Sequence, residues 1–228
     1  MSKKFSSHRP LTILYEDEHL IALFKPAGLL TVATDRGRNE ETLEARANHE
    51  FSARSDHPEG VKLHPCHRLD KDTSGVILFA KGHRVEERMA DLFRERQVKK
   101  KYIAFVHGRP QPPRGEMRSR LEEDRRSRDP EAVSITRYQV KEQRRKFAVV
   151  EVEPLTGRTN QIRIHFKDLG NPLVGENKFI FRKDFDLRFK RTALHAWELF
   201  FKHPVTGVPV GITAPLATDM RNFLEKTR

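Results

Sequence analysis

The sequence predicts an α+β fold in which a mostly antiparallel mixed sheet forms the core, with flanking helices and long loops. Apolar residues recur mainly with period two, in short runs bounded by glycine, proline and aspartate, as they do in strands. Only three stretches have the spacing of an amphipathic helix. The 228 residues suffice for one domain with its own core, and no internal repeat divides them.

Eight segments have the alternation or the short apolar run of a strand. They are 11–15, 19–24, 75–80, 101–106, 134–140, 147–153, 198–202 and 208–213. The sequence Lys25-Pro26-Ala27-Gly28 follows the second segment and has the proline and glycine of a turn. Segment 75–80 is apolar almost throughout, so we expect it to be a buried strand.

Helices are predicted where apolar residues recur every three or four positions. The predicted helices are 84–97, 158–169 and 216–226. The second of them stops at a Gly-Asn-Pro sequence that begins at Gly170. Segments 34–61 and 110–131 are polar, and we expect them to be long loops, which in a compact domain are often functional.

The composition excludes several classes of protein. No apolar run approaches the roughly 20 residues that a membrane span needs, and the first residues lack the apolar segment of a secretory signal. The single cysteine, Cys66, can form no internal disulfide and is too little for a zinc ribbon or an iron–sulfur cluster. We therefore expect a cytoplasmic protein, with Cys66 as a small filler.

The charge indicates a polyanionic partner. Lys and Arg number 44 against 32 Asp and Glu, so the formal net charge is +12. A field of that sign attracts nucleic acid, and no clean basic amphipathic helix points to a membrane surface instead. The basic residues form local groups: Arg125, Arg126 and Arg128; Arg144, Arg145 and Lys146; Lys99, Lys100 and Lys101.

The densest polar segment, 64–75, leads directly into the apolar strand 75–80. His64, His67 and Asp70 could ligate a metal if the segment were helical, although it has the residues of a loop. Asp70 and Asp72 could hold a divalent cation. Asp70 could instead be a nucleophile or general base beside an arginine, or a polar turn residue making a local cap.

A second polar cluster lies in segment 155–165, where Gln161 and Arg163 alternate with isoleucines. Arg163 has apolar neighbours on both sides, so we expect it to be partly buried. A buried guanidinium needs a carboxylate partner. This segment by itself equally allows a purely structural Arg–Glu pair.

Five stretches, taken in order, resemble the RluA-type RNA pseudouridine synthases. His67-Arg68-Leu69-Asp70 with Thr73-Ser74-Gly75 resembles the family's HRLDxxTSG signature. The other four are 15–28 (YEDxxLxxxxKPxG), 101–108 (within KxYxAxVxG), 157–175 (GRTHQIRxH…GxPxxGD) and 194–207 (LHA…HPxTG). Two positions depart from the pattern: Asn160 stands where the family usually has His, and Glu176 where it has Asp. We expect both to affect substrate or fine structure rather than the class of activity.

The resemblance implies an isomerase that converts uridine to pseudouridine in RNA and needs neither metal nor organic cofactor. It implies that Asp70 is the catalytic carboxylate, by attack on the sugar or by deprotonation. Arg163 would ion-pair with Asp70, keeping it ionised and oriented. Tyr102 would pack on the target base, and Leu199 would add apolar contact beneath it.

The resemblance also implies residues that bind RNA. Arg68 would fill the space that the target base vacates when it leaves a stem. The expected RNA-binding residues are Arg68, His67, Thr73, Arg158, Gln161 and Leu199. We expect a monomer with a single catalytic domain over 1–228, an ordered core over 11–226 and no separate S4-type RNA-binding domain. The substrate would be structured ribosomal RNA or tRNA, with ribosomal RNA slightly favoured.

Two other classes of function remain open. One is a non-catalytic RNA-binding or ribosome-assembly factor that keeps the fold. The other is a metal-dependent nuclease or transferase that uses Asp70 and Asp72. Pseudouridine formation in the presence of a chelator separates all three hypotheses.

Overall fold

The structure, a computed structural model, describes residues 10–33, 40–55, 60–122, 132–180 and 187–227. The strands are β1 Ile13–Glu16, β2 Leu20–Lys25, β3 Leu63–Pro65, β4 Ser74–Lys81, β5 Lys99–His107, β6 Arg114–Ser119, β7 Ser134–Gln143, β8 Phe147–Pro154, β9 Leu194–Lys202 and β10 Pro209–Thr213. The described helices are α1 Leu43–Ser52, α2 His83–Arg94, α4 Gln161–Asp168 and α5 Thr218–Lys226. None of these helices is long and apolar enough to cross a membrane.

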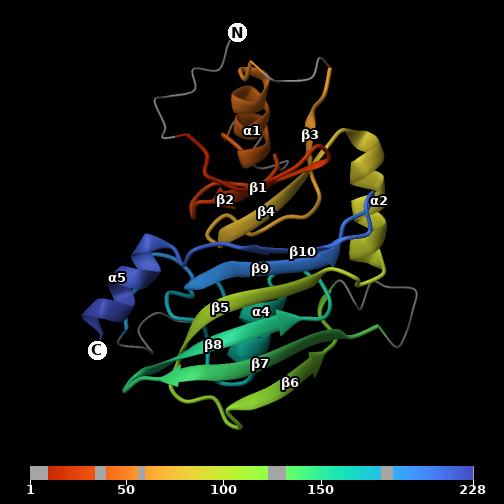
Figure 1. The fold of residues 1–228 in the computed structure, drawn as a ribbon. Helices are drawn as coiled ribbons and strands as arrows, with labels where there is room; N and C mark the ends of the chain where they lie inside the picture. Colours follow the sequence, from red (N-terminus) through yellow and green to blue (C-terminus); the bar gives the residue numbers. More distant parts are fainter. Residues whose placement is uncertain (1–9, 34–39, 56–59, 123–131, 181–186, 228) are drawn as a thin grey trace.

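The strands form one ten-stranded sheet in the order β1-β2-β4-β9-β5-β8-β7-β6, with β10 beside β9 and β3 beside β4 (Figure 1). Every pairing is antiparallel except that of β4 with β9, which is parallel. The α+β fold with a mostly antiparallel mixed sheet is thus confirmed. This parallel pairing of β4 with β9, called the parallel joint below, places the loop before β4 in the middle of the sheet.

Glycine is required at the parallel joint. Gly75 has φ +124° and pairs with Ala196, and a Cβ on Gly75 would lie 2.1 Å from the Ala196 carbonyl oxygen. No other residue permits the two backbones to approach so closely. The apolar core also runs through β4, whose residues are buried except for Lys81.

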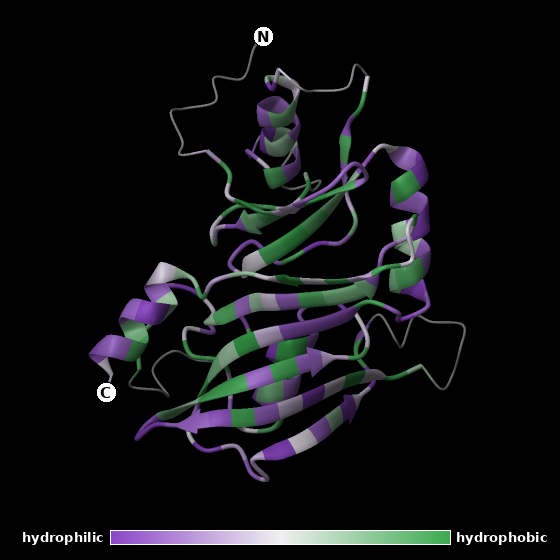
Figure 2. Cartoon of the chain, viewed as in Figure 1, coloured by the Kyte–Doolittle hydropathy of each residue, from purple (hydrophilic) through white to green (hydrophobic). Residues whose placement is uncertain are grey.

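The core lies on both sides of the sheet. One cluster gathers around β2, β4, α1 and α2, a second lies between α4 and the strands β5, β7 and β8, and a third lies under α5. Figure 2 shows β4 as hydrophobic along most of its length, whereas β6 and β7 alternate with polar residues. The first two clusters meet at β5 and β9, where the cavity described below opens.

All eight predicted strands and all three predicted helices are present, with ends shifted by a few residues. The prediction missed β3 and was wrong in treating α1 and β6 as parts of long loops. α1 has only three buried apolar residues among polar ones, and β6 has no apolar alternation because it is the last strand of the sheet. Other parts of those segments lie outside the described residues, as do Arg125, Arg126 and Arg128.

Candidate active site

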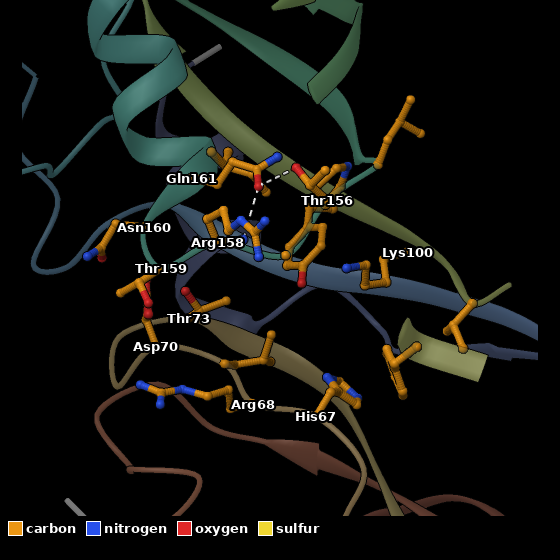
Figure 3. A pocket seen from close by; sticks show the side chains of 18 of the residues that line it. His67, Arg68, Asp70, Thr73, Lys100, Thr156, Arg158, Thr159, Asn160 and Gln161 are labelled. Carbon is orange, nitrogen blue, oxygen red and sulfur yellow. Dashed lines mark hydrogen bonds between the residues drawn. The ribbon is translucent and has the colours of Figure 1, made fainter. Parts of the chain in front are cut away.

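A cavity of about 580 Å³ opens between the loop before β4, the C-terminal end of α2 and the start of α4. This size is typical of ligand pockets. Among the described residues, the only carboxylate that lines it is Asp70, and six cationic side chains line the same cavity. They are Arg68, Arg94, Arg96, Lys100, Arg158 and Arg163. Figure 3 shows Asp70 and Arg68 at one end of the cavity, His67 and Lys100 at the other, and Arg158 between them.

The loop that carries Asp70 is held from within. The buried Thr31 hydroxyl accepts from the Leu69 N–H at 3.1 Å and donates to the Leu69 carbonyl at 3.0 Å. The Thr73 N–H donates to the Asp70 carbonyl at 3.0 Å, which closes a tight turn. The Asp70 side chain itself remains 31% exposed and faces the cavity. The loop therefore has a rigid backbone that presents one accessible carboxylate.

The buried Lys25 side chain hydrogen-bonds to backbone carbonyls of the same loop. Its fully buried Nζ donates to the carbonyls of Pro26 at 3.1 Å, Lys71 at 3.0 Å and Thr73 at 2.8 Å. Burial lowers the pKa of Lys25 to about 7. Three acceptors match the three N–H bonds of the ammonium form. The sequence pattern predicts only a turn at Lys25; its place in the KPxG stretch was the available signal for this role.

The Arg191 side chain also hydrogen-bonds to this loop. It is 7% exposed and donates from Nη1 to the Asp72 carbonyl at 3.0 Å and from Nη2 to the Ser74 hydroxyl at 3.1 Å. Asp219 at the start of α5 accepts two bonds from the same guanidinium, at 2.7 and 2.9 Å. Because Arg191 follows no local pattern, the sequence offered no signal for it.

Arg163 contacts Asp70, but its principal carboxylate partner is a different residue. Arg163 Nη1 lies 3.6 Å from Asp70 Oδ2, which is longer than a hydrogen bond. Glu176, whose side chain is fully buried, accepts from Nε at 2.7 Å and from Nη2 at 2.8 Å. Asn160 Oδ1 accepts from Nη1 at 2.7 Å. The expected ion pair with Asp70 is thus secondary to a bidentate pair with Glu176.

The charges of this group are mutually stabilised. Burial favours the neutral form of Glu176, but the Arg163 guanidinium and two backbone N–H groups outweigh burial and lower the pKa of Glu176. Burial likewise opposes the charge on Arg163, but Glu176, and to a lesser degree Asp70, raise the pKa of that group. Both positions that depart from the family pattern, Asn160 and Glu176, therefore hold the arginine that faces Asp70.

Tyr102 lies on β5 in the cavity wall. Burial, reinforced by the Asp70 charge, raises the pKa of Tyr102, so its hydroxyl stays protonated. Leu199 does not lie in this wall: it is 2% exposed and belongs to the core around β4 and α2. Leu194 lines the cavity instead. The expectation that Leu199 contacts the base is corrected accordingly.

The remaining predicted residues divide into buried and accessible ones. His67 Nε2 accepts from the Leu78 N–H at 3.1 Å, and burial lowers its pKa to about 3, so the ring is neutral. Thr73 and Gln161 are each 3% exposed. Gln161 donates to the Ile135 carbonyl and accepts from the Arg158 N–H, both inside the protein. Arg68 is exposed, and Arg158 is half-buried.

Comparison with known proteins identifies the family. A family model described as RNA pseudouridylate synthase matches residues 19–168. The dual-specificity RNA pseudouridine synthase RluA of Vibrio cholerae is 37% identical over 85% of this chain and 78% of its own. The ribosomal large subunit pseudouridine synthase D of Xylella fastidiosa is 35% identical over 96% and 70%. The solved structure of human RNA pseudouridylate synthase domain containing 4 superposes with a TM-score of 0.75 at 26% identity, over 95% of this chain and 92% of that one.

Proposed function

This chain belongs to the RNA pseudouridylate synthase family and isomerises uridine to pseudouridine in RNA, and on that premise we propose that Asp70 is its catalytic carboxylate. One observation supports this assignment above the others. Asp70 is the only acidic side chain lining the cavity among the described residues, on a loop held by Lys25 and Arg191.

The reaction separates the uracil nitrogen from the ribose carbon, turns the base and joins carbon 5 of the base to the same ribose carbon. The proton on carbon 5 leaves and the freed nitrogen gains one, so atoms and electrons balance. Asp70 attacks the sugar or removes a sugar proton, and either role requires the ionised carboxylate. Arg163, held by Glu176, faces that charge. Tyr102 packs against the base and keeps its proton for hydrogen bonding.

The target base must leave its stack before it can reach Asp70, at a cost of a few kcal/mol. Arg68 is exposed at the cavity rim, two residues from Asp70. Its planar guanidinium can stack in the vacated position while contacting phosphate. Arg94 and Arg158, which also line the cavity, offset the cost of extrusion by binding the RNA backbone.

We propose large-subunit ribosomal RNA as the substrate to test first, with tRNA second. Two kinds of relative support this order, since one is named a ribosomal large subunit synthase and another a dual-specificity enzyme. Mapping pseudouridines in total RNA from cells with and without the gene identifies the position. We propose the cytoplasm as the compartment, because a single cysteine offers no disulfide.

Asp70→Asn tests the catalytic assignment. The change keeps the size of the side chain and removes its charge, so we expect folded protein that binds RNA and forms no measurable pseudouridine. Asp72→Asn is the control, because Asp72 is exposed and only its carbonyl is used by Arg191. Turnover by pure Asp70→Asn protein would overturn the assignment. Assays with chelator test the metal-dependent alternative, and RNA binding without turnover by the unchanged chain would favour the non-catalytic one.

A further inference from the structure

The end of α2 has an unusual residue for its backbone conformation. The Arg96 N–H donates to the Phe93 carbonyl and the Gln97 N–H to the Leu92 carbonyl. These are the two bonds of the motif that ends many helices, in which the position of Arg96 is left-handed and usually glycine. Arg96 has φ +59°. A side chain there costs about 1 kcal/mol relative to glycine.

The strained backbone of Arg96 lies in the wall of the cavity. Among the described residues, only Arg96 and Asn160 have positive φ without being glycine, and both line the same cavity. Asparagine tolerates the left-handed region, but arginine has no such tendency. Strained positions of this kind collect at binding sites, where the side chain is needed despite its backbone cost. Arg96 is also exposed and, among the described residues, has no side-chain partner.

A second cation that has no partner among the described residues lines the same cavity. Lys100 is half-buried in the cavity wall, and Figure 3 shows its side chain directed into the cavity. Its Nζ lies 3.5 Å from the position that a Cβ on Gly157 would take, so it rests against bare backbone. Within the described part of the chain no acceptor or carboxylate pairs with it. A half-buried ammonium without a partner is costly unless a ligand supplies the anion.

These cations lie beyond the catalytic group rather than on it. Lys100 and Tyr102 are two residues apart on one face of β5, so about 7 Å separates them along the strand. The Phe93 ring centroid lies 5.2 Å from that of His67 at this end, and Val98 precedes Lys100 by two residues. Both line the cavity and add apolar surface for a sugar or base. This end of the cavity, defined by Phe93, Arg96, Val98 and Lys100, fits a nucleotide next to the one that reacts.

We propose that Arg96 and Lys100 bind phosphate groups of the RNA strand beside the target uridine. This proposal rests on the proposed function of the cavity and adds a second subsite to it. A phosphodiester supplies the anions that both cations lack, and a guanidinium can donate two parallel hydrogen bonds to one phosphate. Neither residue touches the base that reacts, so the subsite acts on affinity and not on chemistry.

The experiment measures binding of a short fluorescent oligouridylate to the full chain as a function of salt. We expect Arg96→Gly and Lys100→Met each to reduce the slope of log affinity against log salt by about 1, the loss of one phosphate contact. Lys99→Met is the matched control, because Lys99 is exposed on the opposite face of β5. With unmodified ribosomal RNA transcript, KM should rise while kcat stays within about twofold.

Arg96→Gly also separates binding from structure. Glycine suits the left-handed position, so its thermal midpoint should equal or exceed that of the unchanged chain while its affinity falls. Arg96→Lys should retain the salt slope. A wild-type slope in Arg96→Gly and Lys100→Met, or an equal loss in Lys99→Met, would overturn the subsite. Absence of pseudouridine formation by the unchanged chain would instead count against the proposed function, and the binding slopes would still decide the subsite.

Discussion

The two ends of the cavity differ in how their charges are balanced. At the Asp70 end, Arg163 has a bidentate carboxylate, and Lys25 and Arg191 have carbonyl acceptors for their N–H groups. At the α2 end, Arg96 and Lys100 have no partner among the described residues. Groups that must hold a defined geometry are thus paired inside the protein, whereas groups that bind the substrate backbone are left for the substrate to pair.

The largest expected effect on stability and turnover comes from changing Glu176, at the Asp70 end of the cavity. Glu176→Gln keeps the size of the side chain but leaves the Arg163 charge without its bidentate partner. Breaking a buried pair costs about 3–5 kcal/mol of unfolding free energy, and we expect kcat to fall with it. Chemical denaturation and single-turnover rates measure both. Glu176→Asp is the control and should retain most activity; equal stability of Glu176→Gln and the unchanged chain would contradict the pairing.

Lys25 is expected to have the next largest effect. Lys25→Met removes a donor from the carbonyls of Pro26, Lys71 and Thr73. The Lys71 carbonyl keeps the Gly28 N–H, whereas an acceptor left buried and unsatisfied costs about 1–3 kcal/mol. Removing the buried Lys25 charge offsets part of this cost. We therefore expect the free energy of unfolding, measured by chemical denaturation, to fall by about 2 kcal/mol and turnover to fall with it. Lys71→Met, on the exposed surface of the same loop, should leave stability nearly unchanged. Comparable losses of unfolding free energy in the two variants would contradict the role of buried Lys25 in supporting the Asp70 loop.

Arg68, at the Asp70 end of the cavity, is expected to have a smaller effect, on the isomerisation rate. Arg68→Ala should slow isomerisation about tenfold when the uridine lies in a stem and only a few-fold when it lies in an unstacked loop, because an unpaired base is cheaper to extrude. Both substrates are assayed under single-turnover conditions. Equal losses on the two RNAs would show that Arg68 only supports the shape of the Asp70 loop.

The last expected effect appears only when pH is changed, and it concerns His67. Burial lowers the pKa of this ring to about 3 in the folded state, against an ordinary value of 6.5. The unfolded chain therefore binds more protons between these values, and stability falls as pH drops through that window. His67→Gln should make the slope of stability against pH shallower there by at most about 1.4 kcal/mol per pH unit. An unchanged slope in urea titrations at pH 4 and 6 would show that His67 is not held neutral.

Much of the fold follows from local patterns in the sequence. Alternation and short apolar runs locate the eight predicted strands, since a residue's place on a half-buried sheet depends on its near neighbours. The excess of Lys and Arg by itself indicates a polyanionic partner. The match of five ordered stretches assigns the reaction and points to Asp70. Weak or unpatterned elements such as α1 and β6 are missed because tertiary contacts, not propensity, stabilise them.

The tertiary structure alone decided which groups meet. Arg163 and Glu176 are thirteen positions apart, and Arg96 becomes unusual only once its backbone is seen to be left-handed. Likewise Leu194 and Leu199 share one strand, but the packing of β4 and α2 covers the second and leaves the first in the cavity. Sequence carries the chemistry of each side chain and its local spacing; the partner that balances a charge is set by long-range packing, which no local pattern contains.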